Sequence, residues 1–517
     1  MTFIAAECEP WAKTGGLADV VDALARALGQ IAGDALETPV DVFLPRYRGV
    51  APELDSAAGR RVRVADPFAL GGATDVRLLD VAGDGYRLRL VDHPPAFDRA
   101  GLYGDGAADH PDNAWRFGLL CRAALETLRL EGRPPDVLHL HDWHAAPAVL
   151  LRDAIADADP ADPLGRAAVL LTVHNLAYHG WTPRERLAQF GVVPGDGIVG
   201  PGADGLDLLA AAVERADLVN TVSPGFAEEA RTPAFGMGLD ARLAARGDRF
   251  VGILNGLDTD AWDPARDAVI AAPYTRADRG GKAACRADLV ARLGLERAPD
   301  GPILGMIGRL DPQKGFDLLA GAAPALLDRG ARLVVQGSGD PALVGELRRL
   351  AAERPERVAL IERFDREMAR RIYAGADLFL MPSRFEPCGT GQMIALRYGT
   401  PPIVHATGGL RDTVVDEHDR PGRGTGFVFR HPTPEGLVWA CEQAMTQWRA
   451  RGSRWSRLLD RGMAVDFDWR TGSAPRYVEA YERAVALRRA VSRRRAGRPS
   501  TGASPSARRR ATSVASG

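Results

Sequence analysis

The feature that most constrains the fold is an alternation of short apolar segments with helical patterns, and it runs along the chain twice. Short apolar strands that alternate with helices are typical of an α/β domain built on a parallel sheet. The first series extends from a strand expected at 2–6 to one at 249–254, and the second series starts at 303–307. Because 517 residues exceed what one hydrophobic core usually supports, we predict two Rossmann-like, doubly wound domains. Ligands bind outside the carboxyl ends of such sheets, so two facing sheets predict a cleft between domains.

The segment between the two series has a different composition. It is rich in Asp, Pro, Ala and Arg and carries several turn signals, which indicates a connector with one short helix at 282–293. The end of the chain is rich in Arg, Ser, Ala and Gly and has almost no apolar residues, which is typical of a disordered tail. The predicted boundaries are 1–258 for the N-terminal domain, 259–301 for the connector or hinge, 302–465 for the C-terminal domain and 488–517 for the tail.

Charge and cysteine content narrow the range of partners and compartments. Nine arginines and no acids lie between Arg488 and Arg510, so the rest of the chain has 57 basic and 67 acidic residues. An acidic body argues against a nucleic-acid-binding surface. Five scattered cysteines suit a reducing cytoplasm, and no apolar run is long enough to cross a membrane. We therefore expect a cytoplasmic protein with no nucleic-acid or membrane partner.

The most informative segment for function is 381–399, MPSRFEPCGTGQMIALRYG. An apolar strand runs into a lone carboxylate, Glu386, and a helix is expected to begin near Gly391. Unpaired N–H groups at a helix start favour an anion such as phosphate, and a nearby carboxylate can hold hydroxyl groups. This layout fits a nucleotide-sugar, although a buried loop whose acid caps its own helix would show the same pattern.

A second candidate is the loop Lys13-Thr14-Gly15-Gly16-Leu17-Ala18-Asp19, which follows the first expected strand. Its glycines allow a tight turn and a close approach to a ligand, and Lys13 is a point charge suited to phosphate. Glu7 ends the strand just before the loop. The loop is neither a Walker P-loop nor G-x-G-x-x-G, so ATPase and dehydrogenase functions lose their main support.

Three histidines in six residues, His139, His141 and His144, raise the question of a metal site. The order of ligands, with Asp142 among them, does not match the metallohydrolase pattern H-x-H-x-D-H, and no second ligand cluster follows. We therefore expect no metal. A histidine at the carboxyl end of a strand that hydrogen-bonds a substrate is the favoured interpretation, and a structural histidine is the alternative.

Two further turns follow strands of the second series. Arg309 and Lys314 lie in the loop 309–315, where two cations could neutralise a diphosphate leaving group, unless the loop is simply solvated. The turn 407–412 has small residues and opens a helix. Together with the turn 389–391 it could direct two helix N-termini toward one anion, or it could be an ordinary strand-to-helix turn.

These motifs resemble those of bacterial glycogen synthases and plant starch synthases, the retaining glucosyltransferases of the GT-B fold. The resemblance covers roughly 2–485, and its most specific motifs are Lys-Thr-Gly-Gly-Leu at 13–17 and Glu-Pro-Cys-Gly at 386–389. The segment 466–469 resembles the start of the family's last helix, so a helix at 466–487 is expected to pack back toward the N-terminal, starch synthase catalytic domain. The resemblance implies glucose transfer from ADP-glucose to the 4-hydroxyl of an α-1,4-glucan (glycogen), without metal or cofactor.

The resemblance also assigns roles to individual residues. Glu386 would hold the donor glucose, and Arg309 and Lys314 would neutralise the diphosphate. His141 would lie near the reacting sugar, and Glu7 near the acceptor. The residues expected to bind the nucleotide-sugar or its hydroxyls are Lys13, Gly15, Gly16, Asp19, Asn255, Phe364, Cys388, Gly389, Thr390, Gly391, Thr407, Gly408 and Gly409.

Two positions depart from the family pattern, and three alternatives stay open. Thr390-Gly391 replaces a Leu-Thr-like pair, and Phe364 stands where a Tyr usually contacts the adenine. The chain could use another donor, such as UDP-glucose, or another acceptor. It could also be a nucleotide-sugar epimerase, which needs no polysaccharide, or a glucan-binding protein without activity. Such a binding protein need not keep Arg309, Lys314 and Glu386 together.

Overall fold

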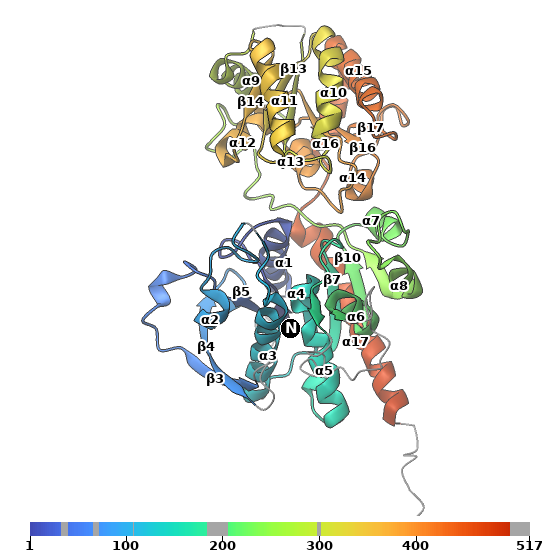
Figure 1. Cartoon of the computed structure of the whole chain (residues 1–517). Coiled ribbons are helices and arrows are strands. Elements are labelled where there is room, and N and C mark those ends of the chain that lie inside the picture. The colour runs from blue at the N-terminus through green and yellow to red at the C-terminus, as the bar shows by residue number, and fades with distance from the viewer. Residues whose placement is uncertain (33–39, 66–71, 107, 184–204, 297–300, 497–517) are drawn as a thin grey trace, which may run out of the picture.

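The computed structural model describes residues 1–32, 40–65, 72–106, 108–183, 205–296 and 301–496. Strands of the first series form a nine-stranded sheet, and strands of the second form a six-stranded sheet. Figure 1 shows the two sheets with their helices as separate units, one above the other. None of the described helices combines the length and apolar character needed to cross a membrane.

The N-terminal sheet has the order β11-β10-β7-β6-β1-β2-β5-β4-β3. Its strands run parallel from β11 to β5, and the direction of winding reverses between β1 and β6. Contrary to the expected parallel sheet, β4 runs antiparallel to both of its neighbours, β3 and β5, because short connections join these three strands. The strands are β1 (Thr2–Ile4), β2 (Val40–Pro45), β3 (Arg60–Ala65), β4 (Ala73–Ala82), β5 (Tyr86–Asp92), β6 (Val137–His141), β7 (Ala168–Val173), β10 (Leu218–Thr221) and β11 (Phe250–Gly252).

Helices cover this sheet, so its central strands are buried along their whole length. A small antiparallel pair, β8 (Trp181–Pro183) and β9 (Gly205–Asp207), lies outside the sheet. The helices of this unit are α1 (Gly16–Ala32), α2 (Pro94–Phe97), α3 (Asn113–Leu130), α4 (Asp142–Ala145), α5 (Pro147–Ala158), α6 (Leu208–Arg215), α7 (Pro224–Glu229) and α8 (Asp240–Ala245).

The C-terminal sheet is parallel throughout, with the order β14-β13-β12-β15-β16-β17. This is the doubly wound order 3-2-1-4-5-6, and its switch point lies between β12 and β15. The strands are β12 (Ile303–Ile307), β13 (Arg332–Gln336), β14 (Val358–Ile361), β15 (Leu378–Met381), β16 (Pro402–His405) and β17 (Phe427–Phe429). The helices are α10 (Phe316–Asp328), α11 (Pro341–Glu353), α12 (Arg366–Gly375), α13 (Gly391–Arg397), α14 (Gly408–Thr413), α15 (Pro434–Ala450) and α16 (Ser453–Met463).

Much of the expected connector is packed onto the C-terminal unit rather than being a free linker. Its helix α9 (Gly280–Leu293) lies against α12, because Cys285 and Leu289 are spaced to share one apolar face and both are buried. The ammonium of Lys282 donates to the carbonyl oxygens of Ala374 and Tyr398, each at 3.0 Å. If one unit moves against the other, we therefore expect the hinge to lie nearer to Leu257 than to α9.

The last helix, α17 (Ala474–Ala496), returns along the N-terminal sheet and packs against β7 and β10 (Figure 1). It extends beyond residue 487, where we expected the disordered tail to begin. Arginine is a good helix former, and the buried Arg488 donates a hydrogen bond to the carbonyl of Gly165, which anchors this part of the helix. Residues 497–517 of the predicted tail lie outside the described residues.

Two chain segments cross side by side between the units. The N–H of Leu257 donates to the carbonyl of Phe467 at 2.7 Å, and Arg26 pairs with Asp258 at 3.0 Å. A second contact joins the segment around α7 to the C-terminal unit. There, the Ser223 hydroxyl donates to the carbonyl of Pro387 at 2.6 Å. These contacts fix which loops of the two sheets lie near each other.

Candidate active site

The switch point of the C-terminal sheet brings together two residues that are 72 positions apart in the sequence. The Lys314 ammonium lies 2.6 Å from a carboxylate oxygen of Glu386, and the Ser383 hydroxyl donates to the same oxygen at 3.1 Å. Glu386 is only 5% exposed. The loops after β12 and β15 carry these residues, as the sequence analysis expected, because adjacent parallel strands end at the same edge.

Arg309 occupies the same loop as Lys314 but points differently. Its guanidinium is largely exposed, pairs with Asp311 and donates to the Gln313 side chain at 3.2 Å. Asp311 also accepts the backbone N–H of Lys314 at 2.8 Å. Asp311 therefore holds the loop in shape, and Arg309 contacts Asp311 and Gln313 rather than Glu386.

The turn at 407–409 packs directly on the loop that carries Glu386. The N–H of Gly409 donates to the Glu386 carbonyl at 3.1 Å. At Gly408 a Cβ would lie 2.1 Å from the same carbonyl, and φ is +41°, so only glycine allows this approach. The Gln392 amide donates at 3.0 Å to the carbonyls of Cys388 and Gly389, just before Thr390 and Gly391 open α13.

The anion at the start of α14 is a protein carboxylate, Glu229 at the end of α7 in the N-terminal unit. The N–H of Gly408 donates to it at 2.8 Å, and the Thr407 hydroxyl lies 3.2 Å away. Burial raises the pKa of Glu229, and the Gly408 N–H opposes this. Nothing in the local sequence pattern pointed to this residue, because its partners are almost 180 positions away.

Glu7, three residues after the end of β1, holds the glycine-containing loop of the N-terminal sheet. Its carboxylate accepts four hydrogen bonds: from the N–H of Thr14 at 2.6 Å, the Thr14 hydroxyl at 2.6 Å, the N–H of Gly15 at 3.1 Å and the Tyr103 hydroxyl at 2.6 Å. Both oxygens are engaged and Glu7 is 3% exposed. The geometry therefore supports a positioning role, and contact with an acceptor stays a prediction.

The loop itself is exposed and carries a paired cation. Lys13 lies 2.5 Å from Asp19 and 3.3 Å from Glu9. A Cβ built at Gly15 or Gly16 would meet no atom within 4 Å, and neither residue has a positive φ. The fold therefore does not itself require glycine at these two positions.

The segment just before this loop contacts the C-terminal unit near Phe364. Glu9 pairs with Arg366 of α12 at 3.1 Å. Phe364, two residues earlier, is 70% exposed, which is unusual for a large apolar ring. An exposed aromatic face beside a charged inter-unit contact is suited to stacking against a planar ring.

The histidines lie at the switch point of the N-terminal sheet, and all are buried. His139 hydrogen-bonds Thr172 at 2.7 Å and Tyr481 of α17 at 2.9 Å. His141 Nδ1 lies 3.1 Å from His174 Nε2, and no partner of its Nε2 is found among the described residues. Burial lowers the pKa of His139 and His141, so both are neutral. The described residues contain no group of three or more potential metal ligands.

Two more buried polar groups flank this edge. Asp142 has φ +57° and accepts the N–H of His174 at 2.7 Å, and burial raises its pKa to about 7. Asn255, which follows β11, is 7% exposed, and its side-chain oxygen has no partner within the described ranges. Buried polar atoms without protein partners are suited to binding a hydroxylated ligand.

Comparisons with known proteins agree with this arrangement. The starch synthase catalytic domain family matches residues 1–245, and glycosyl transferases group 1 matches 292–456. The catalytic domain of starch synthase IV from Arabidopsis thaliana, solved bound to ADP and acarbose, is 34% identical with a TM-score of 0.82. That match covers 94% of this chain and 99% of the other. The chain is therefore a glycosyltransferase with the predicted GT-B fold.

Relatives at higher identity define the family. The glycogen synthase of Anaeromyxobacter dehalogenans (strain 2CP-C) is 44% identical over 489 residues, which cover 93% of this chain and 98% of the relative. The glycogen synthase of Syntrophotalea carbinolica is 40% identical and covers 94% and 99%. The chain belongs to the glycogen synthase family, and the resemblance read from its motifs is confirmed.

Proposed function

We propose that the protein transfers glucose from ADP-glucose to the 4-hydroxyl at the non-reducing end of an α-1,4-glucan, with retention of configuration. The glycogen synthase relatives support the reaction, and the ADP and acarbose bound to the similar starch synthase support the donor nucleotide and a glucan-like acceptor. All five cysteines are free and buried, which supports a reducing compartment such as the cytoplasm.

The observation that carries the proposal is the Lys314–Glu386 pair at the C-terminal switch point. A sugar diphosphate places hydroxyl groups and a dianionic group next to each other, so it can engage both members of this pair. Glu386 would accept hydrogen bonds from glucose hydroxyls, and Lys314 would neutralise the diphosphate as it leaves. A cation held in place is worth most where charge develops in the transition state.

The remaining donor-side residues of the C-terminal unit would act beside this pair. Arg309 would turn from Asp311 to the diphosphate, and the N–H groups of Thr390 and Gly391, at the start of α13, would add hydrogen bonds to it. Phe364 would stack on the adenine. The phenol that the family usually has at this position is missing, so the base would be held by stacking alone.

The N-terminal unit would supply the other side of the site. Gly16 leaves open space beside Lys13, where a donor can approach the backbone. His141 lies at the end of β6 with its buried Nε2 available to a sugar, and Asn255 offers an unpartnered oxygen. Asp19 would bind hydroxyls after releasing Lys13. We expect full activity after treatment with a chelator, because the proposed chemistry uses no metal or cofactor.

A donor panel tests the proposal. ADP-glucose and UDP-glucose would each be incubated with glycogen, and both the released nucleoside diphosphate and the lengthened glucan would be measured. Faster transfer from ADP-glucose is expected. Preference for UDP-glucose would overturn the assignment of the donor, and an isomerised sugar formed without glycogen would favour an epimerase. Nucleotide binding without turnover of any donor would favour a binding protein without activity.

A further inference from the structure

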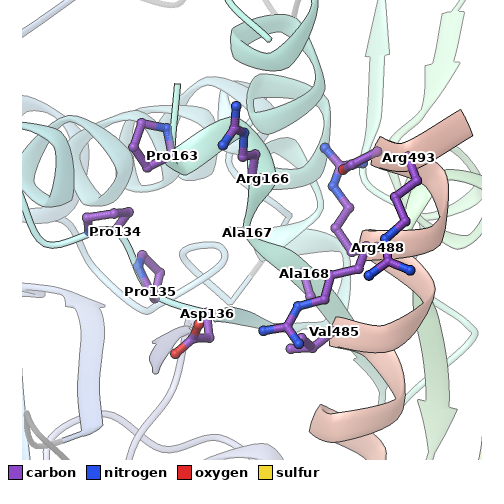
Figure 2. A pocket seen from close by; sticks show the side chains of 12 residues that line it. Pro134, Pro135, Asp136, Pro163, Arg166, Ala167, Ala168, Val485, Arg488 and Arg493 are labelled. Atoms are coloured by element: carbon purple, nitrogen blue, oxygen red, sulfur yellow. The ribbon is translucent and has the colours of Figure 1, made fainter. Parts of the chain in front are cut away.

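A separate pocket lies at the edge of the N-terminal sheet opposite to His141. It has a volume of about 430 Å³ and is formed where β6 and β7 begin, beside the end of α17 (Figure 2). His141 is at the carboxyl end of β6, whereas Asp136 of the pocket precedes that strand. Five strand residues at about 3.3 Å each place the two sites roughly 17 Å apart. A ligand in this pocket would therefore not overlap the proposed donor site.

The pocket is strongly basic. Arg166 lies before β7, Arg488 and Arg489 are neighbours on α17, and Arg493 lies one turn further along it. Asp136 is the only acid in the lining, and Figure 2 shows Arg166, Arg488, Arg493 and Asp136 around the pocket. Four guanidinium groups against one carboxylate leave a formal charge of about +3 in the lining, and the side chains of Arg489 and Arg493 are exposed to solvent. Because like charges repel, such a cluster favours an anion that neutralises part of its charge.

The arginines differ in how they are held. The buried Arg488 is fixed by its hydrogen bond to the Gly165 carbonyl, and Arg166 donates through Nε to the Pro160 carbonyl at 3.2 Å. The guanidinium groups of Arg489 and Arg493 form no ion pair or hydrogen bond with any residue of the described part of the chain. By contrast, Arg476 and Arg483 of the same helix pair with Glu479 and Asp248. The pocket end of α17 therefore has charge that the protein itself does not neutralise.

The rest of the lining indicates the kind of anion. Pro134, Pro135 and Pro163 form rigid walls on the side that faces α17, and Val485 adds an apolar side chain (Figure 2). A volume of this size is within the range of small-molecule pockets. The chain beyond the helix is not a suitable occupant, since residues 497–517 contain four more arginines and no acidic side chain.

We propose that this pocket binds a small organic phosphate, with the phosphate group held by Arg489 and Arg493 and the organic part against the prolines. Guanidinium groups bind phosphate through paired, charge-assisted hydrogen bonds. The apolar walls would add affinity for an organic group that inorganic phosphate lacks. The site is separate from the donor site and does not depend on the proposed function.

Calorimetric titration with phenyl phosphate, inorganic phosphate and benzyl alcohol tests the proposal. The full-length protein would be titrated in excess ADP, so that phosphate binding at the donor site is suppressed. Phenyl phosphate is expected to bind with a dissociation constant of about 1 mM or lower. Inorganic phosphate should bind more weakly, and benzyl alcohol should not bind measurably.

Charge-reversal variants locate the binding. R489E/R493E should weaken phenyl phosphate binding at least about tenfold, whereas the control R476E/R483E, with the same charge change on the same helix, should bind like wild type. Thermal unfolding would establish that both variants are folded. The proposal is overturned if wild type shows no binding at a phenyl phosphate concentration of about 10 mM, tenfold above the expected dissociation constant. It is also overturned if the two variants lose affinity equally. Failure of ADP to bind would count against the proposed function but would leave this comparison between variants readable.

Discussion

The two halves of the candidate site differ in how their polar groups are satisfied. In the N-terminal half, Glu7 accepts four hydrogen bonds from its own unit, and His139 is held on both sides by Thr172 and Tyr481. In the C-terminal half, Glu386 has one cationic partner, Lys314, and one hydroxyl partner. The first half is therefore organised by internal bonds, while the second keeps a charge pair whose members a substrate can engage.

This difference predicts different consequences of mutation. Removing charge from the C-terminal half should reduce the rate of transfer more than it changes the loop structure. Removing a hydrogen-bond acceptor from the N-terminal half should loosen the loop first and affect catalysis through the loop. The ratio of the activity effect to the stability effect therefore distinguishes the two halves.

The largest effect is expected for Lys314→Ala. Loss of a transition-state charge partner should lower kcat/KM for glucose transfer by at least about a hundredfold. The exposed Arg348 of α11, which pairs with Glu362, provides a control, and Arg348→Ala should keep kcat/KM within about twofold of wild type. Steady-state kinetics with ADP-glucose and glycogen measure both. Transfer by Lys314→Ala close to the wild-type rate would refute the role of this residue.

Glu7→Gln tests the other half. A glutamine side chain has only one acceptor oxygen, so its NH₂ group would either face the backbone N–H groups of Thr14 and Gly15 or require the Thr14 and Tyr103 hydroxyls to accept instead of donate. The free energy of unfolding should fall by about 1–3 kcal/mol, and kcat/KM should fall with it. Denaturant unfolding of this variant beside Glu53→Gln, at an exposed position, gives the comparison. Normal stability combined with lost glucan binding would instead favour direct contact of Glu7 with the acceptor.

Asp142 allows the stability of the N-terminal half to be tested through its pH dependence. Burial raises its pKa from 3.8 to about 7, so the folded protein keeps a proton that the unfolded chain releases. Its stabilising contribution is therefore present at low pH and is lost as the pH rises from about 4 to 7, with a slope of about 1.4 kcal/mol per pH unit. Asp142→Asn should remove this component, and asparagine tolerates the positive φ. Unfolding curves with the same pH dependence in both proteins would show that Asp142 is ionised in the folded state.

The sequence predicted those parts of the site that follow from sheet topology. Loops after the first and fourth strands of a doubly wound sheet meet at a switch point, so Lys314 and Glu386 could be placed together before their distance was known. The strand β12 also begins and ends where the apolar pattern predicted, at 303–307. Local pattern suffices here because buried parallel strands are apolar along their whole length.

The contacts that depend on distant side chains could not be predicted in this way. Glu7 and Tyr103 are 96 residues apart, and Glu229 reaches Gly408 from the other unit. No periodicity records such pairs. The antiparallel strands β3 and β4 and the extension of α17 to Ala496 were missed for a related reason: each is stabilised by packing on a neighbour rather than by its own apolar pattern.

The smallest expected effect, Gly16→Ala, separates a requirement of the fold from a requirement of the ligand. A Cβ at Gly16 meets no protein atom within 4 Å, and Gly16 is the first residue of α1, where alanine is the better helix former. The free energy of unfolding should therefore stay the same or rise by up to about 1 kcal/mol. If the donor approaches this backbone closely, its KM should still rise about fivefold, because the added methyl group takes up space that the ligand needs. Gly472→Ala, at another position with open space, is the control and should change neither quantity strongly. An unchanged KM in Gly16→Ala would show that the donor does not approach this loop closely, and the contacts of the N-terminal half with the substrate would then be left to His141 and Asn255.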